Sequence, residues 1–497
     1  MASANSTSTS KLIVIQRLCF ILFAFSILSC LSFIYWPFHC NSTSCNPNAC
    51  IHTSFSLTSP LENHHPVDLL SFPSSWNHLS FPSKPPPPKT LKIALFVKRW
   101  PRRTLAGGLE RHALTLHLAL AKRGHQVHIF TTNSPNETFN NMFFHVTPPT
   151  KAGYINQPLA WEQFRILNSD NPFDVIHTES VALYHARARN FSNLVVSWHG
   201  IAYETIHSDI VQDMLRAPDE HRQKAINERI GKVIDEVKFF QDYAHHVATS
   251  DHVGDVLRRV YMVREDRVHV IVNGVDDRVY KLDVPRGMEY RERIGVPQNA
   301  ALVFGLAGRL VKDKGHPLMF EAIKQLYEES VSFKNSVVFL VAGDGPWASR
   351  YSELWPNVVV LGPLEQSELA SFYNSLDVFI NPTLRAQGLD HTIIEAMMSG
   401  VAVAATRFAS ITGSLIVGPE AGYTFLPTVD SLKRCLYRIW EDGKVTIKKK
   451  GEFARGRAAR LFTANKMALA YEKLFLCVAS QNETKNENNY CKYQGMR

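Results

Sequence analysis

The chain is poor in cysteine and lacks the residue spacings of a metal-binding or redox protein. Eight cysteines in 497 residues are too few for a disulfide-dense scaffold. No Cys-x-x-Cys redox pair and no zinc-ligand spacing occur, and the sequence predicts no metal site. Aromatic-rich RNA motifs and basic helical arms are also missing. Nucleic acid therefore ranks last among the anionic partners that a formal net charge of +9 favours.

The composition is that of an ordinary globular protein, with 45% hydrophobic and 20% charged residues. This balance argues against a disordered or collagen-like chain. The length suggests roughly two or three domains, each large enough to bury its own core.

One uncharged apolar run stands out near the N-terminus, from Leu18 to Trp36. A helix of that length can just span a bilayer. Lys11 and Arg17 precede the run, and the stretch directly after it carries no Lys or Arg. The positive-inside rule then predicts a type II anchor at 18–36, with a short cytosolic tail and the rest of the chain in the secretory lumen. A cleaved signal peptide is the alternative, although the run is long for one.

Residues 37–90 are rich in Ser, Pro, Asn and His, which predicts a stem that is too polar to pack. Four Asn-x-Ser/Thr triplets follow the anchor and permit glycosylation in a lumen: Asn41, Asn136, Asn190 and Asn482. Cysteines just past the anchor and near the C-terminus can pair in an oxidising lumen, in a connectivity that the sequence leaves open.

A strand–glycine loop–helix–strand unit begins directly after the stem. Leu91–Val97 is a continuous apolar run, as in a buried parallel strand. Leu109–Arg123 reads as a helix with one apolar face, and Gln126–Thr131 as the next strand.

The same alternation then runs twice. Predicted strands and helices continue through the first stretch, 91–285, and restart at Ala301 for a second, 286–478, before a polar tail at 479–497. This pattern predicts an α/β protein with two doubly wound, Rossmann-like domains. Ligands of such sheets bind at the carboxyl ends of the strands, so we expect the site in a cleft between the halves.

Two loops that directly precede predicted helices have the chemistry to hold a diphosphate. Gly107 and Gly108 let backbone amides approach an anion at a helix N-terminus, although a tight turn explains them equally well. Gly308, Arg309 and Lys314 follow the strand that starts the second half. Arginine offers a two-pronged donor and lysine a point charge, so the pair suits phosphate. A solvated basic loop is the alternative.

A polar loop and a histidine complete the set of candidates. Gln387 and Glu395 lie about two turns apart around a predicted helix start, and the carboxylate of Glu395 could accept two ribose hydroxyl protons. A core salt bridge is the plainer explanation of Glu395. His199 directly follows a predicted strand, where a histidine is a candidate site residue, although a structural role is common for such a residue.

In this order the motifs resemble family 4 of the retaining, nucleotide-sugar-dependent glycosyltransferases, which have the GT-B fold. The resemblance covers about 91–475. It includes Gly107-Gly108-Leu109-Glu110, Val272-Asn273-Gly274, Gly308-Arg309-Leu310 with Lys314-Gly315, Ala342-Gly343-Asp344-Gly345, and Glu395-Ala396-Met397 with Gly400.

The resemblance implies roles for these residues. Arg309 and Lys314 would hold the donor diphosphate, and Glu395 the ribose. The Gly107–Gly108 loop would cover the phosphates or the reacting centre, and His199 would contact the donor sugar. The donor would be a nucleoside diphosphate sugar and the acceptor a hydroxyl of a glycan, lipid or small molecule, with no cofactor and no essential metal. The Golgi or ER lumen is the expected location.

One position departs from the family pattern. The family has a first glutamate where this chain has Gln387, followed by Gly-aromatic-Gly where it has Gly388, Leu389 and Asp390. In the family this segment holds the donor sugar's hydroxyls, so sugar identity is open. A catalytically weak sugar-nucleotide-binding or scaffold protein is the alternative, and a sugar-nucleotide epimerase on the same fold is a third reading.

Overall fold

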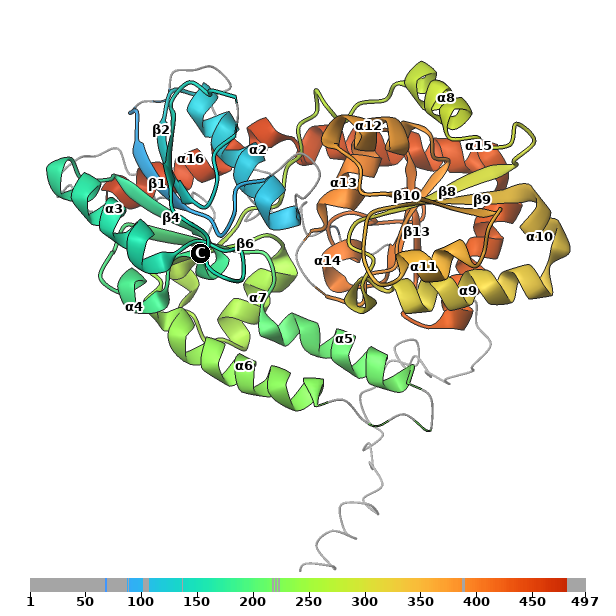
Figure 1. Ribbon diagram of the computed structural model, residues 1–497, viewed down its shortest axis with the longest axis horizontal. Helices are drawn as coiled ribbons and strands as arrows, with labels where there is room; N and C mark the ends of the chain where they lie inside the picture. The colour runs from blue at the N-terminus through green and yellow to red at the C-terminus, as the bar shows by residue number, and fades with distance from the viewer. Residues whose placement is uncertain are drawn as a thin grey trace, which may run out of the picture. The chain divides into compact units, whose positions relative to one another are not determined.

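The computed structural model describes residues 68, 87, 89–101, 107–135, 137–216, 219, 221, 224–386 and 389–480. Its first half is a parallel sheet in the order β3-β2-β1-β4-β5-β6-β7 (Figure 1). The strands are β1 (Lys92–Phe96), β2 (Gln126–Thr131), β3 (Met142–Val146), β4 (Val175–Glu179), β5 (Leu194–Trp198), β6 (His245–Ala248) and β7 (Val268–Val270). The helices of this half are α2 (Gly108–Lys122), α3 (Gln157–Asp170), α4 (His185–Ala188), α5 (Ala202–Met214), α6 (Ala225–Phe239) and α7 (Asp251–Arg259), with short 3-10 turns η3 (Ser180–Ala182), η4 (Phe240–Asp242) and η5 (Glu265–Arg267).

The second half is a parallel sheet in the order β10-β9-β8-β11-β12-β13. Its strands are β8 (Leu302–Ala307), β9 (Val337–Ala342), β10 (Val358–Gly362), β11 (Val378–Asn381), β12 (Ala402–Thr406) and β13 (Tyr423–Phe425). The remaining helices are α8 (Val284–Arg293), η6 (Lys312–Lys314), α9 (His316–Glu329), α10 (Val331–Ser336), α11 (Ala348–Ser352), α12 (Gln366–Asn374), α13 (His391–Met398), α14 (Ala409–Thr412), α15 (Val429–Leu461) and α16 (Ala464–Ser480).

The central strands are apolar on both faces because helices cover both sides of each sheet. β1 pairs in parallel with β2 and with β4, with Ile93 opposite Val127 and Val175. In the second half, β8 lies in the same way between β9 and β11. These pairings confirm the expected two Rossmann-like sheets, and they bring the carboxyl ends of the central strands to one edge of each sheet.

Glycines let the loops at these strand ends approach each other closely. Gly315 has φ +79°, and a Cβ there would lie 1.7 Å from the carbonyl oxygen of Pro382. A Cβ on Gly343 (φ +136°) would lie 1.9 Å from the carbonyl oxygen of Gly308. Only glycine fits such positions without strain. The loop after β8 is therefore held against the loops after β9 and β11.

The C-terminal part of the second stretch forms two helices, α15 and α16. α15 contains a break at Gly443 (φ 67°, ψ 171°), and the chain leaves it at Phe462 before α16 starts. α16 falls within the stretch assigned to the second half, yet it packs against α2 of the first, where Glu472 bonds Arg123 at 2.8 and 2.7 Å. Figure 1 shows α16 beside α2 and β1. The last helix thus returns to complete the first half.

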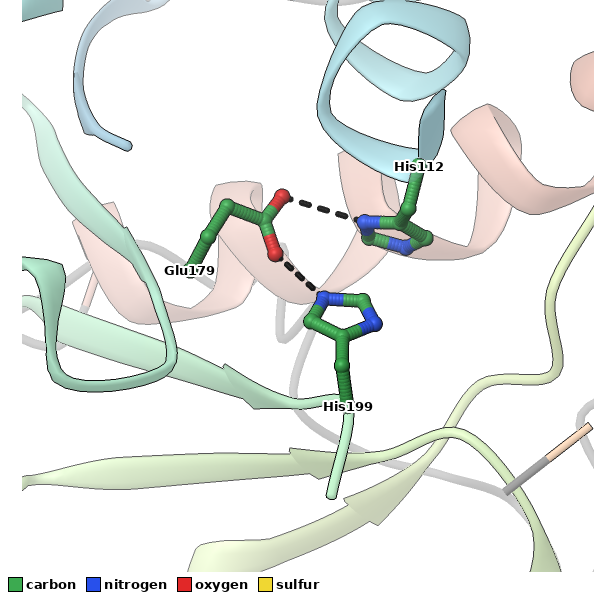
Figure 2. Close-up of side chains that lie close together, drawn as sticks. All are labelled: His112, Glu179 and His199. Carbon is green, nitrogen blue, oxygen red and sulfur yellow. Dashed lines mark hydrogen bonds and ion pairs between the residues drawn. The ribbon is translucent and has the colours of Figure 1, made fainter. Parts of the chain in front are cut away.

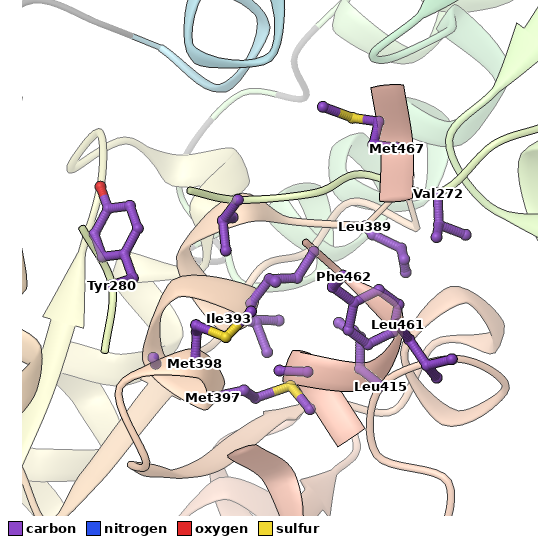
Figure 3. Close-up of a cluster of buried hydrophobic side chains, with 14 of the residues drawn as sticks. Val272, Tyr280, Leu389, Ile393, Met397, Met398, Leu415, Leu461, Phe462 and Met467 are labelled. Atoms are coloured by element: carbon purple, nitrogen blue, oxygen red, sulfur yellow. The ribbon is translucent and has the colours of Figure 1, made fainter. Parts of the chain in front are cut away.

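A buried apolar cluster fixes the helix α13 (Figure 3). It joins Ile393 and Met397 of α13 to Phe462 and Met467 at the junction of α15 and α16. The predicted turn at Asn273-Gly274 contacts this junction, since a Cβ on Gly274 would lie 2.3 Å from the Thr463 carbonyl oxygen. α13 is therefore anchored from both halves of the protein.

The expected anchor at 18–36 lies outside the described residues. Among the helices that are described, none combines the length and the apolar character needed to cross a bilayer. Most of the expected stem also lies outside them. Its residue Asp68 is described, and its carboxylate pairs with both terminal nitrogens of Arg457 on α15, at 2.7 and 2.8 Å.

Candidate active site

The start of α13 brings several predicted site residues together. Asp390 caps this helix, and its carboxylate accepts a hydrogen bond from the Thr392 amide at 3.1 Å. The other oxygen of the same carboxylate lies 2.7 Å from Lys314 Nζ on η6. Burial would raise the pKa of Asp390, but Lys314 and Thr392 outweigh it and lower the pKa. The lysine and a carboxylate are therefore a charged pair beside a helix N-terminus.

Glu395 lies one turn further along α13 and is almost fully buried. Its carboxylate pairs with Arg111 of α2 at 2.9 and 3.1 Å and accepts a hydrogen bond from the Tyr373 hydroxyl at 2.8 Å. Burial raises the pKa of Glu395, and Arg111 and Tyr373 offset only part of that rise. The residue expected to hold a ribose is thus bound by one residue from each half of the protein.

The glycine loop of the first half lies next to α13. Gly107 is the N-cap residue of α2, and Gly108 is its first residue. A Cβ on Gly108 would lie 3.6 Å from His391 Nδ1, so the two helix starts are neighbours. Burial lowers the pKa of His391 well below its usual value, and Arg111 lowers it further. A neutral histidine therefore lies between the two helix starts.

His199 follows β5, and its ring is 10% exposed. Its Nε2 lies 2.5 Å from Glu179, a fully buried carboxylate at the end of β4. The other oxygen of Glu179 lies 3.0 Å from His112 Nδ1 on α2. Figure 2 shows the carboxylate between the two rings, with one oxygen facing each. Burial alone would raise the pKa of Glu179, but the two histidines outweigh it and lower it.

The remaining predicted residues are placed as follows. Gly308 follows β8 with φ +126°, and the side chain of Arg309 is exposed. Leu389 is buried, and its carbonyl accepts a hydrogen bond from Asn273 Nδ2 at 2.6 Å. Gln387 and Gly388 lie outside the described residues.

A cleft of about 690 Å³ opens between the two halves beside α13. Its walls come from α2, the loop after β2, the start of α12 and α13. Residues that line it include Arg111, Asn133, Tyr280, Gln366, His391 and Glu395. Of the predicted site residues, Glu395 lines this cleft, whereas Arg309, Lys314 and His199 are not among its lining residues.

Several residues of this site could not be recognised from the sequence pattern. Arg111 directly follows the glycine loop motif, which was the available signal. Tyr373 and Glu179 belong to helices and strands far away in the chain, and only the folded sheet order brings them in. His112 falls on a helix face that reads as core.

Residues 106–279 match the family model of Glycosyltransferase Family 4, and residues 301–442 match that of Glycosyl transferases group 1. Together these matches span more than half of the chain. The protein belongs to glycosyltransferase family 4. It is thus a glycosyltransferase that moves a sugar from a nucleotide sugar, in a family that retains the anomeric configuration.

Relatives and solved structures agree with this assignment. The chain is 28% identical over 309 residues to D-inositol 3-phosphate glycosyltransferase of Xylanimonas cellulosilytica, which covers 56% of this chain and 70% of the relative. Sucrose-phosphate synthase of Thermosynechococcus elongatus is similar in structure, with a TM-score of 0.61, 20% identity and coverage of 78% and 98%. Anabaena Alr3699/HepE in complex with UDP and glucose gives a TM-score of 0.58, 17% identity and coverage of 78% and 99%. These structures confirm the GT-B fold.

Proposed function

We propose that this family 4 glycosyltransferase is a type II membrane protein that transfers a hexose to an acceptor hydroxyl in the lumen of the Golgi or ER. Arg309 and Lys314 bind the donor diphosphate, Glu395 binds the ribose, and His199 contacts the sugar. The acceptor is a hydroxyl of a glycan, a lipid or a small molecule.

The observation that carries this proposal is the arrangement at the start of α13. Lys314 lies at the amino end of that helix, where the helix dipole also favours an anion. Arg309 comes from the neighbouring loop after β8 with an exposed guanidinium. A diphosphate placed there meets two cations and a helix N-terminus, which suits its charge in the absence of a metal ion.

The reaction follows from this placement. As the sugar–phosphate bond breaks, negative charge builds on the leaving diphosphate, and fixed cations stabilise it without reorganising. In the family's proposed route, the leaving phosphate takes the acceptor's proton on the same face of the sugar. The protein then contributes mainly charge stabilisation and positioning.

A hexose donor is supported by the relatives. The Anabaena structure holds UDP and glucose, and another relative is a GDP-mannose-dependent alpha-mannosyltransferase of Corynebacterium glutamicum. The lumenal location rests on the charge asymmetry around 18–36.

Two experiments test the proposal. The full chain in detergent is screened against UDP-, GDP- and ADP-hexoses, by thermal shift and by release of nucleotide. A true donor raises the Tm by mass action and is slowly hydrolysed. Protease protection of a C-terminal tag on intact microsomes tests the topology. A tag that is digested without detergent contradicts the lumenal location.

Three features of the site favour a second function. Glu395 is engaged by Arg111 and Tyr373, Lys314 is neutralised by Asp390, and Gln387 stands where the family has a carboxylate. A sugar-nucleotide-binding or scaffold protein would tolerate all three. Donor binding without hydrolysis or transfer to any acceptor would favour this function.

A further inference from the structure

The buried carboxylate of Glu179 is held between His112 and His199. The hydrogen bonds behind it decide which atoms carry protons. A carboxylate that is ionised only accepts hydrogen bonds, whereas each ring nitrogen can donate or accept. The protons in the chain of contacts behind His112 can therefore be assigned one contact at a time, starting from a group that can only accept a hydrogen bond.

The chain of hydrogen bonds begins at the carbonyl of Ala113, which can only accept a hydrogen bond. It lies 2.8 Å from His117 Nδ1, so that nitrogen carries a proton. Burial lowers the pKa of His117 to about 4 and that of His177 well below its usual value, so both rings are neutral at pH 7. His117 Nε2 then accepts from His177 Nδ1 at 2.9 Å, and His177 Nε2 accepts from the Ser197 hydroxyl at 2.8 Å.

The remaining contacts of the chain run from Ser197 toward His112. Since Ser197 has donated its proton to His177, it accepts from the Tyr471 hydroxyl at 2.8 Å. Tyr471 has no further proton for His112 Nε2, and that contact is the longest of the chain at 3.5 Å. His112, whose pKa burial lowers, therefore keeps its proton on Nδ1, where it donates to Glu179. Every short contact is satisfied with neutral histidines and an ionised Glu179.

This assignment determines the state of His199. The second oxygen of Glu179 accepts from His199 Nε2, and Nδ1 lies on the opposite side of the ring (Figure 2). We propose that Glu179 is a positioning residue that holds His199 in its Nε2-protonated form, so that Nδ1 accepts a hydrogen bond from a hydroxyl of the donor sugar. The inference rests on the proposed function, in which His199 contacts that sugar.

A preference among donors follows. A neutral sugar offers a hydroxyl proton to Nδ1, whereas a carboxylate in the same place would face a lone pair backed by the charge of Glu179. Neutral hexoses should therefore be favoured over hexuronic acids. The other titratable groups that interact electrostatically with His199 are His112 of α2, His177 of β4 and His391 of α13. Burial lowers the pKa of each of these three histidines.

The same side chains have the chemistry of metal ligands. The ligand atoms of His112, Glu179 and His199 lie within 4.8 Å of one another. With protons on His112 Nδ1 and His199 Nε2, both oxygens of Glu179 accept hydrogen bonds and no metal ion is needed. We therefore interpret these contacts as hydrogen bonds. Metal analysis of the purified full chain distinguishes the two cases.

The main test is Glu179→Gln in the full-length protein. The amide group has one accepting and one donating atom, so it cannot accept from both histidines. With a donor identified in the hexose screen, kcat/KM should fall about ten-fold or more, because a misplaced proton disables a site histidine. In a His199→Ala background the same change should have no further effect, since Glu179 acts through His199. Glu162→Gln is the control: it makes the same change on the exposed face of α3, where the side chain is 59% exposed, and kcat/KM should stay within about two-fold.

A second readout is independent of activity. In protein with ¹⁵N-labelled histidine, the His199 signal, identified by its loss in His199→Ala, should report a proton on Nε2 and none on Nδ1. In Glu179→Gln this pattern should change. An unchanged His199 signal overturns the proposal, as does an additive loss in the double variant or one equivalent of bound metal. Failure of the wild type to use any donor refutes the proposed function instead, and leaves the histidine signal to decide this inference.

Discussion

Arg111 and Glu395 form a buried ion pair, with Arg111 Nη1 2.9 Å from one carboxylate oxygen, although 284 positions separate them in the chain. Arg111 belongs to the helix after the glycine loop and Glu395 to α13, so the pair joins the two halves beside the cleft. Their side chains are 16% and 2% exposed. The ribose that we propose for Glu395 would share its carboxylate with this arginine and with Tyr373.

Replacing Arg111 should destabilise the fold. Arg111→Met leaves the carboxylate of Glu395 buried without its cation, and breaking one side of a buried pair costs about 3–5 kcal/mol. The double variant Arg111→Met/Glu395→Gln removes the stranded charge and should recover part of that loss. Unfolding in urea, followed for both variants and the wild type, measures the effect. A single variant within about 0.5 kcal/mol of the wild type would show that the pair is not formed.

Diphosphate binding should depend on the two predicted cations. Arg309→Ala removes an exposed guanidinium, so it should leave the fold intact and weaken binding of a nucleoside diphosphate about ten-fold or more. Lys314→Ala should weaken binding similarly, and it should also lower stability because Asp390 loses its partner. Calorimetric titration with UDP and GDP measures the affinity.

The control for this pair is Lys312→Ala. Lys312 lies on the same short turn as Lys314, but its side chain is exposed and the contacts at α13 do not involve it. Lys312→Ala removes the same charge from the same loop as Lys314→Ala. Equal losses in all three variants would indicate a general effect of positive charge and would refute a specific diphosphate site.

Stability should fall with rising pH because of Glu204 on α5. Burial raises its pKa from 4.5 to about 8, and Arg385 and the Ile201 backbone offset only part of this. Below pH 4.5 the carboxyl is protonated in both the folded and the unfolded chain. Between pH 4.5 and about 8 the unfolded chain releases the proton and the folded one retains it, so stability declines across that window.

Glu204→Gln should abolish that decline, because the amide does not titrate. The measurement is Tm at pH 5 and pH 8.5, at roughly 1 °C for each kcal/mol in a protein of this size. Glu328→Gln makes the same change at an exposed helix position and should follow the wild type. Parallel curves for the wild type and Glu204→Gln would show that Glu204 titrates normally.

The sequence predicted the central strands well because each is a continuous apolar run covered on both faces. The expected strand at 126–131 coincides with β2, and the apolar run 91–97 contains β1. Only one of the five residues of the edge strand β3 is buried, and β13 has three residues, so neither carries that signal. The pattern therefore missed one edge strand of each sheet.

The site could be predicted in part for a similar reason. Loops that follow strands of one sheet meet at one edge, which explains why Lys314 and Asp390 are in contact. The partners of Glu395 and His199 depend on how the two halves face each other and on the order of β4 and β5. No local pattern encodes those relations. The return of α16 to the first half is of the same kind, since it depends on the contact between Glu472 and Arg123.

The last prediction concerns the departure at Gln387 and the neighbouring Asp390. One oxygen of Asp390 caps α13 and the other pairs with Lys314, so Asp390→Ala loses both contacts. Asp390→Asn keeps a cap but removes the charge, and separates the two effects. A neutral glutamine at 387 can still bond a sugar hydroxyl at about half the strength of a charged acceptor. We therefore expect Asp390→Ala to lower the transfer rate more than Gln387→Ala, with Asp390→Asn between them.

Gln387→Glu adds a second carboxylate three residues before Asp390, so it should shift donor preference or weaken transfer by repulsion. Rates on the preferred donor, measured for all five proteins, decide the matter. If the wild type is inert and Gln387→Glu alone transfers sugar, the chain is a binding protein that has lost its catalytic carboxylate.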